Sequence, residues 1–250
     1  MTRPPVGQTE SVEIDVDSLS TVLFDLDGTL IDTTDLIFQS YRHAYRQEFG
    51  EWLELEDLYL GYGRPLQDAF GAILDHQGIR LAGLARGELI ERLILLYREF
   101  NLARHDDLAH AFPGVREVVG ELRQRGYRLG LVTSKSRVIA ERGLHLIGLS
   151  EQFAVTVFME DSRRHKPDPE PLRVALNRFG QNERPASALY VGDSTHDLIA
   201  GRAAGLQTGA ALWGPFPPES LIALQPTYVL ESAAALLTTC PSLASSSSGS

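Results

Sequence analysis

Apolar and polar residues along this chain form blocks that predict strands alternating with helices. The first apolar run, 21–24, contains β-branched and aromatic residues, which is typical of a strand buried on both faces. Comparable runs occur in the second half of the chain, each followed by a segment with apolar residues at helical spacing. These later strands are expected at 128–133, 155–159, 188–191 and 207–212. The alternation predicts an α/β fold with a mostly parallel sheet and helices on both faces.

The segment after the first strand has a different pattern, because residues 36–110 contain no strand-like run. Residues 66–76 and 88–101 predict helices, the second with its apolar residues on one stripe. We therefore expect an all-helical domain inserted into a discontinuous sheet domain. The expected divisions are an N-terminal extension at 1–20, a sheet domain at 21–35 and 111–240, a helical domain at 36–110 and a flexible, serine-rich tail at 241–250.

Composition narrows the class of protein. Hydrophobic residues make up 43% and charged residues 22% of the 250 residues, which is ordinary for a soluble globular protein. No apolar run approaches the length of a membrane span, and residues 1–10 lack a signal-peptide pattern. Cys240 is the only cysteine, which agrees with a reducing cytoplasm, and the net charge of −10 argues against a nucleic-acid partner. We expect a cytoplasmic protein; no pattern indicates its oligomeric state.

Polar side chains follow each expected strand at the point where it ends. In parallel sheets the carboxyl ends of the strands meet at one edge, where ligands bind. Each of these residues alone has a simpler interpretation, such as helix capping by Thr133 or Asp193, or a solvated loop lysine at 166. Their joint position at one sheet edge favours a common site. The residues concerned are Asp25, Asp27, Thr133, Ser134, Lys135, Lys166, Asp193 and Asp197.

The two acids after the first strand indicate a cation site. Asp25 and Asp27 are two residues apart, so in an extended strand both side chains would point to one face. Two carboxylates that close repel each other unless a cation or a shared proton intervenes, and Mg²⁺ prefers oxygen ligands. A calcium-binding loop is excluded, because Leu30 stands where the turn glycine belongs and Leu36 where the bidentate glutamate belongs.

Taken in order, these motifs resemble a known family. Asp-Leu-Asp-Gly-Thr-Leu at 25–30, Thr133, Lys166 in Lys-Pro-Asp-Pro, and Gly192-Asp193 with Asp197 are similar to the four motifs of the haloacid-dehalogenase superfamily of phosphotransfer enzymes. The resemblance covers about residues 21 to 237. It implies a Rossmann-like core with a helical cap inserted after the first motif. It also implies a Mg²⁺-dependent phosphohydrolase that acts through an aspartyl-phosphate intermediate.

The resemblance implies a role for each acid. Asp25 would be the nucleophile, and a carboxylate can attack phosphorus without first losing a proton. Asp27 would protonate the leaving oxygen and later accept a proton from water. Dehalogenase relatives lack this second acid, because halide leaves without a proton. Hexose-phosphate mutase relatives share it, and no other feature of the sequence favours them.

The resemblance also implies the ligand contacts. Mg²⁺ would be bound by the Asp25 carboxylate, the Asp27 backbone carbonyl and Asp193, while Asp197 would hold a metal-bound water or Lys166 in place. The phosphoryl oxygens would be bound by side chains at the strand ends and by amides of the first loop. These substrate-binding candidates are Gly28, Thr133, Ser134 and Lys166.

The cap is expected to select the substrate, a small phosphorylated molecule. Arg64 in the loop 61–66 is a candidate second anion-binding group, with a solvated loop arginine as the alternative. The segments 97–101 and 105–106, with 126–135 and 166–171, are similar to the pyrophosphatase branch, which implies inorganic pyrophosphate as substrate. Phosphoglycolate phosphatases and other small phosphomonoesterases share the core motifs and remain alternatives. A non-catalytic phosphate-binding regulatory module is a further alternative.

Overall fold

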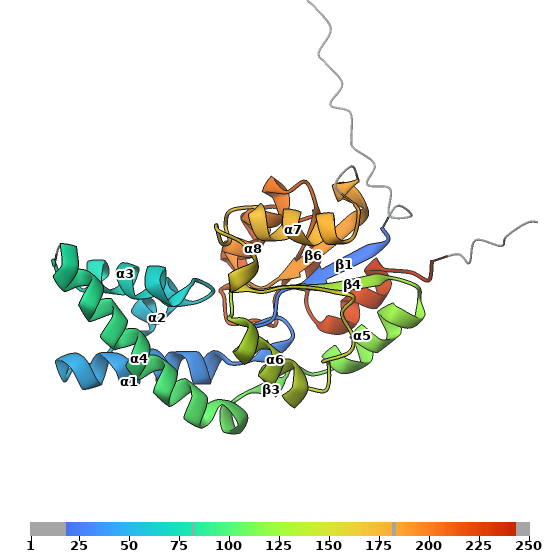
Figure 1. The fold of residues 1–250 in the computed structure, drawn as a ribbon. Helices are drawn as coiled ribbons and strands as arrows, with labels where there is room; N and C mark the ends of the chain where they lie inside the picture. The colour runs from blue at the N-terminus through green and yellow to red at the C-terminus, as the bar shows by residue number, and fades with distance from the viewer. Residues whose placement is uncertain (1–18, 82, 182–183, 244–250) are drawn as a thin grey trace, which may run out of the picture.

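A six-stranded parallel sheet forms the centre of the larger part of the molecule (Figure 1). The computed structural model describes residues 19–81, 83–181 and 184–243. The expected N-terminal extension and serine-rich tail therefore lie mostly outside the described residues. Neighbouring strands pair in the order β5-β4-β1-β6-β7-β8, and every pair is parallel. The strands are β1 (Thr21–Phe24), β4 (Arg128–Val132), β5 (Val155–Val157), β6 (Ala188–Gly192), β7 (Gln207–Ala211) and β8 (Tyr228–Leu230).

Helices cover both faces of this sheet, and the side chains of β1 show why. Val22 and Phe24 belong to one apolar cluster, whereas Leu23 points to the opposite face and belongs to another. Helices α5 (Val115–Gln124) and α10 (Leu236–Thr239) contribute to the first cluster, and α7 (Glu170–Arg178) and α8 (Thr195–Ala203) to the second. Helix α6 (Arg137–Leu146) and the short α9 (Pro218–Ile222) complete this part. The predicted α/β fold class is confirmed.

Four helices lie to one side of the sheet and share an apolar core of their own (Figure 1). They are α1 (Thr34–Phe49), α2 (Leu55–Gly61), α3 (Leu66–His76) and α4 (Gly83–Leu108). Tyr41, Phe70 and Tyr97 pack edge to face or tilted at the centre of this helical core. Two short antiparallel strands, β2 (Ile31–Asp32) and β3 (His110–Ala111), pair where the chain enters and leaves the helices. No described helix has the length and apolar character needed to cross a membrane.

Two details of the helical part differ from the sequence expectation. Helix α2 was not predicted, because its seven residues bury only Asp57, Leu58 and Gly61 and so give no amphipathic stripe. Helix α4 extends beyond the expected 88–101 at both ends. Its buried residues continue to His105, and Arg142 of α6 donates hydrogen bonds to Leu102 O and Asp106 Oδ1 in these last turns.

Candidate active site

The buried side chain of Lys166 contacts residues from three separate parts of the chain. Lys166 Nζ donates hydrogen bonds to Asp25 Oδ1 at 2.7 Å and to Asp197 Oδ1 at 2.6 Å, and it lies 3.0 Å from Tyr190 Oη. Burial alone lowers the pKa of Lys166, but the attraction of Asp197 and Asp25 outweighs burial and raises this pKa well above its usual range. Lys166 is therefore a permanent positive charge between two carboxylates.

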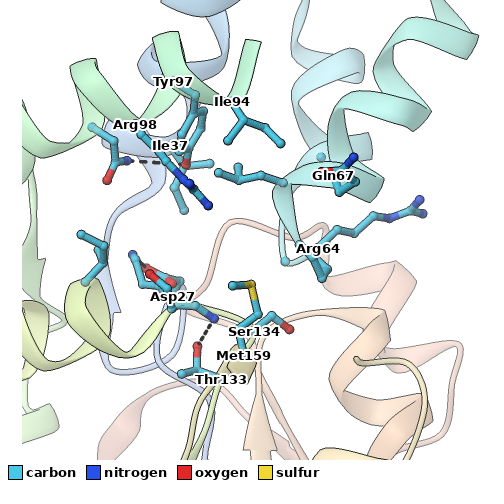
Figure 2. A pocket seen from close by; sticks show the side chains of 18 of the residues that line it. Asp27, Ile37, Arg64, Gln67, Ile94, Tyr97, Arg98, Thr133, Ser134 and Met159 are labelled. Carbon is cyan, nitrogen blue, oxygen red and sulfur yellow. Dashed lines mark hydrogen bonds and ion pairs between the residues drawn. The ribbon is translucent and has the colours of Figure 1, made fainter. Parts of the chain in front are cut away.

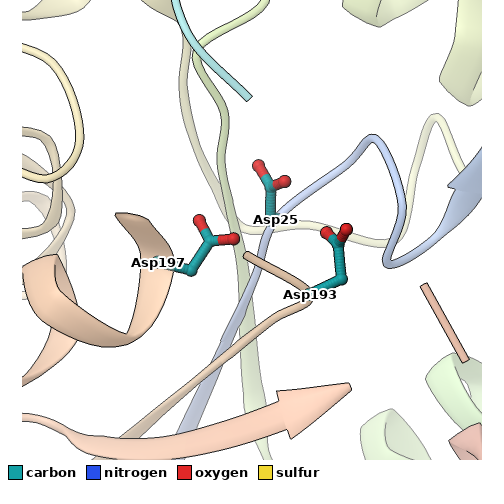
Figure 3. Close-up of side chains that lie close together, drawn as sticks. All are labelled: Asp25, Asp193 and Asp197. Carbon is teal, nitrogen blue, oxygen red and sulfur yellow. The ribbon is translucent and has the colours of Figure 1, made fainter. Parts of the chain in front are cut away.

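Three buried carboxylates come together beside this lysine (Figure 3). Asp25 follows β1, Asp193 follows β6, and Asp197 lies in the first turn of α8; one carboxylate oxygen of each lies within 4.8 Å of the others. Burial raises the pKa of Asp25 to about 7, although Lys166 opposes this, and burial also raises the pKa of Asp193 well above its usual range. The pKa of Asp197 is lowered in spite of burial, because Lys166 and Ser194 bind its oxygens. Burial thus opposes ionisation of Asp25 and Asp193, and a further cation beside them would favour it.

The oxygens of this cluster fit a metal ion. Asp193 Oδ1 accepts a hydrogen bond from Thr29 Oγ1 at 3.1 Å, whereas Asp193 Oδ2 is buried without a partner among the described residues. Both oxygens of Asp197 are already engaged, Oδ1 by Lys166 and Oδ2 by the amide and hydroxyl of Ser194. Hard divalent cations prefer carboxylate oxygens such as these. The buried acidic cluster could therefore bind a metal ion, because Asp25 and Asp193 each keep one carboxylate oxygen that no described residue engages.

Asp27 has partners of its own. Its Oδ1 accepts hydrogen bonds from Thr33 Oγ1 and from Lys135 Nζ, both at 2.5 Å. Strand β1 ends at Phe24, and Gly28 continues the chain with a φ of 80° in a tight turn, so the two acids do not share an extended strand as the spacing suggested. Asp25 joins the buried cluster, and Asp27 sits beside Lys135.

A cavity of about 550 Å³ separates the helical part from these strand ends (Figure 2). Both Asp25 and Asp27 line it. Ser134 Oγ is buried and lacks a partner within the described part of the chain, and Thr133 Oγ1 accepts a hydrogen bond from the Lys135 amide at 3.1 Å. The other polar residues on its core side are Thr133, Ser134, Lys135, Ser136, His165 and Lys166, and those on its helical side include Arg64, Gln67, Tyr97, Arg98 and Asn101.

Most of the candidates at the strand ends converge, but Gly28 neither lines the cavity nor offers a free amide. Asp25, Asp27, Thr133, Ser134, Lys166 and Arg64 line the cavity, and Asp193 and Asp197 lie against Asp25. Gly28 is outside the cavity lining, and its amide donates to Ile31 O at 2.9 Å, so this amide is not free to bind an oxyanion. A Cβ at Gly28 would lie 2.2 Å from Asp193 Oδ2, so this glycine instead makes room for the acid cluster.

Three further residues of the site were not assigned roles from the sequence. Lys135 was noted at the strand end without a role of its own, yet it binds Asp27. Tyr190 lies inside β6, where an aromatic residue is expected in the core, yet its hydroxyl lies 3.0 Å from both Lys166 Nζ and Asp197 Oδ1. Thr29 bonds Asp193. The chain contains only two lysines, Lys135 and Lys166, and both are in this site.

Comparisons with known proteins agree with this geometry. The model of the haloacid dehalogenase-like hydrolase family matches residues 22–211. The chain is 38% identical over 219 residues to the pyrophosphatase PpaX of Bacillus velezensis, covering 88% of this chain and 95% of the relative. The pyrophosphatase PpaX of a Bacillus cereus strain matches with the same identity and coverage.

Solved structures support the fold. A haloacid dehalogenase-like hydrolase from Streptococcus pneumoniae superposes with a TM-score of 0.74 at 22% identity, covering 88% of this chain and 98% of the other. A hydrolase from Pseudomonas syringae superposes with a TM-score of 0.77 at 22% identity, covering 88% and 96%. At this identity the likeness concerns the fold alone. The family match and the closer sequence relatives together show that the chain belongs to the haloacid dehalogenase-like hydrolase family and is a phosphatase.

Proposed function

We propose that this phosphatase hydrolyses inorganic pyrophosphate in a Mg²⁺-dependent reaction that passes through an aspartyl phosphate on Asp25. One observation carries the proposal: the Asp25 carboxylate lines the cavity while Lys166 Nζ holds it at 2.7 Å beside the unpartnered oxygen of Asp193. The two PpaX relatives, 38% identical over most of the chain, support pyrophosphate as the substrate.

The reaction has two steps on one carboxylate. In the first, an Asp25 oxygen forms a bond to phosphorus, and the bond from phosphorus to the bridging oxygen breaks. Asp27 donates its proton to that departing oxygen. In the second, a water oxygen forms a bond to the same phosphorus and gives a proton to Asp27, and the bond between phosphorus and the Asp25 oxygen breaks. Phosphate is released and the Asp25 carboxylate is restored. Thr33 and Lys135 hold Asp27 in place for both transfers.

The transferred phosphoryl group is bound by residues at the ends of β4 and before α7. Thr133 and Ser134 offer hydroxyl groups to its oxygens, and the Ser134 hydroxyl is buried beside the cavity with no partner in the described residues. Lys166 supplies positive charge while it positions Asp25. Removal of one hydroxyl is expected to leave residual activity, since it is one hydrogen bond of several.

Mg²⁺ would suit this oxygen-rich site, where Asp25 and Asp193 of the buried acid cluster would hold it together with the Asp27 backbone carbonyl. When bound, it offsets the negative charge of the phosphoryl oxygens. Asp197 contributes indirectly, because both of its oxygens are engaged and one of them holds Lys166. In this proposal the chemistry takes place in the core, residues 21–35 and 111–240. The cap, residues 36–110, selects the substrate. We place this activity in the cytoplasm.

Phosphate release from pyrophosphate, phosphoglycolate, sugar phosphates and p-nitrophenyl phosphate, measured as kcat/KM with and without Mg²⁺, tests the proposal. We expect pyrophosphate to give the highest value and the Asp25→Asn variant to release nothing. A preference for phosphoglycolate would replace the substrate and keep the mechanism. A folded wild-type protein that releases phosphate from none of them, while still binding phosphate, would be a regulatory module and would overturn the proposal.

A further inference from the structure

Both lysines of the core are engaged before a substrate binds. Lys166 lies between Asp25 and Asp197, and Lys135 lies against Asp27, and these are the only lysines of the chain. Lys166 can serve the phosphoryl group that Asp25 attacks. If the substrate carries a second anionic group, no free lysine of the core is left to bind it.

Two arginines of the cap line the cavity, and they point in different directions. In Figure 2 the Arg98 side chain reaches from the helical wall into the space above Asp27 and Ser134. The Arg64 side chain lies at the far side of the cavity and runs away from Asp27 (Figure 2). The sequence offered Arg64 as a candidate second anion-binding group, with a solvated loop arginine as the alternative, and the geometry favours Arg98.

Arg98 is free to bind a ligand. Across the described residues, no hydrogen bond or ion pair involves its guanidinium, whereas Arg92 of the same helix bonds Glu48 and Arg104 pairs with Asp107. An unpaired guanidinium directed into a cavity that holds catalytic acids has an anionic ligand as its natural partner. Its planar group can bind two oxygens of one phosphate or carboxylate at once.

The helix that carries Arg98 is held firmly at this point. Asn101 Nδ2 donates to Ser40 Oγ of α1 at 3.2 Å and lies 3.5 Å from Tyr97 Oη. Both Tyr97 and Asn101 are buried, and Tyr97 packs against Tyr41 with ring centroids 4.8 Å apart. Tyr97 and Asn101 are thus fixed by packing and hydrogen bonds, so the backbone that carries the Arg98 side chain is rigid.

We infer that Arg98 is a specificity-determining residue that binds the second anionic group of the substrate, the one Asp25 does not attack. This inference rests on the proposed function. For pyrophosphate, that group is the departing phosphate, whose negative charge grows as the bridging bond breaks. Binding from the cap then selects substrates with a second anion over phosphate esters with a neutral remainder.

The test is a ratio of two kcat/KM values, pyrophosphate over p-nitrophenyl phosphate. Only the first substrate carries a second anionic group. A hydrogen bond to a charged group changes a binding constant by about 10- to 100-fold, so Arg98→Ala should lower this ratio by about the same factor. Arg98→Lys keeps the positive charge but loses the planar guanidinium that can bind two oxygens at once, so its ratio should lie between those of Arg98→Ala and the wild type. The matched control is Arg104→Ala on the same helix, outside the cavity, which should keep the wild-type ratio.

A second measurement does not need turnover. The Asp25→Asn protein should bind pyrophosphate in titration calorimetry, and adding Arg98→Ala should weaken that binding by a similar factor. An unchanged ratio in folded Arg98→Ala, or an unchanged affinity in the double variant, would overturn the assignment of Arg98 while leaving the phosphatase mechanism in place. A wild-type protein that cleaves p-nitrophenyl phosphate but no substrate with a second anion would also overturn it. Loss of all activity in the wild type would instead overturn the proposed function.

Discussion

Lys166 Nζ lies 2.6 Å from Asp197 Oδ1, and both side chains are almost completely buried. The contact joins the segment before α7 to the first turn of α8, and it holds the lysine beside Asp25 at the same time. A buried charge that loses its partner costs several kcal/mol, because it can neither return to water nor find another counter-ion. The geometry of the nucleophile therefore depends on this pair.

Lys166→Met should destabilise the fold by roughly 3 kcal/mol, because it leaves two buried carboxylates without their cation. It should also lower kcat/KM by about 10²- to 10³-fold through loss of charge next to the phosphoryl group. Urea unfolding gives the first value and phosphate release the second. The double variant Lys166→Met/Asp197→Asn should be destabilised by less than the sum of the two single variants. Additive effects would contradict a direct coupling.

The raised pKa of Asp25 predicts how stability depends on pH when metal is removed. In the folded protein this carboxyl binds a proton below about pH 7, whereas the unfolded chain binds it only near the ordinary value of 3.8. The folded state therefore gains stability from this group as pH falls through about 7 towards about 4. At about pH 8 with a chelator, Asp25→Asn should be more stable than the wild type, by on the order of 1 to 4 kcal/mol, and this difference should shrink by about pH 5.

The stability of Asp25→Asn must be compared with that of the wild type at each pH, because two histidines change the stability of both proteins with pH in the direction opposite to Asp25. Burial lowers the pKa of His105 and of His196, so both disfavour the folded state once pH falls below about 6.5. Both are present in the wild type and in Asp25→Asn, and their effect cancels in the difference. Denaturant unfolding at several pH values measures it. A less stable Asp25→Asn protein at about pH 8 without metal would contradict the raised pKa.

The sequence predicted the residues at the strand ends because topology alone brings them together. In a parallel sheet with β1 between β4 and β6, the residues that follow these strands must meet at one edge, whatever their side chains do. Asp25, Thr133 and Asp193 are of this kind. Helix α2 escaped prediction for the opposite reason, since a helix of only seven residues is too short to show a periodic stripe and depends on its contacts with α3.

Side-chain direction and the choice between chemically equal partners could not be predicted. Arg64 and Arg98 are equivalent cations in a sequence, and only the packing of the cap helices decides which one points into the cavity. Tyr190 has the same sequence context as any core aromatic residue of a strand. Gly28 suggested a phosphate-binding amide, but the turn uses that amide for Ile31. These outcomes depend on tertiary contacts that periodicity and spacing do not encode.

If Asp193 binds Mg²⁺, its substitution should reduce the stabilisation of the folded protein by Mg²⁺, which thermal unfolding measures without any enzymatic turnover. Mg²⁺ that binds only the folded state stabilises it by about 2.7 kcal/mol at 100 times its dissociation constant. We expect Mg²⁺ to raise the thermal midpoint of the wild type and to have little effect on Asp193→Asn, which loses the charge of a buried, unpartnered oxygen. Asp75→Asn, in the exposed ion pair with Arg86, is the matched control and should keep the full shift. A full shift in Asp193→Asn would exclude this acid as a ligand.

The two groups that hold Asp27 should matter most when the leaving group needs a proton. Thr33→Val and Lys135→Ala each remove one hydrogen bond to Asp27 Oδ1, so we expect kcat for glycerol phosphate, whose alkoxide leaves poorly, to fall by about 10-fold or more. The loss for p-nitrophenyl phosphate should be smaller, because nitrophenolate leaves without protonation. Thr33→Ser keeps the hydroxyl and should behave as the wild type. Equal losses for both substrates would show that Thr33 and Lys135 act on phosphate binding or on folding, and not through the proton that Asp27 transfers.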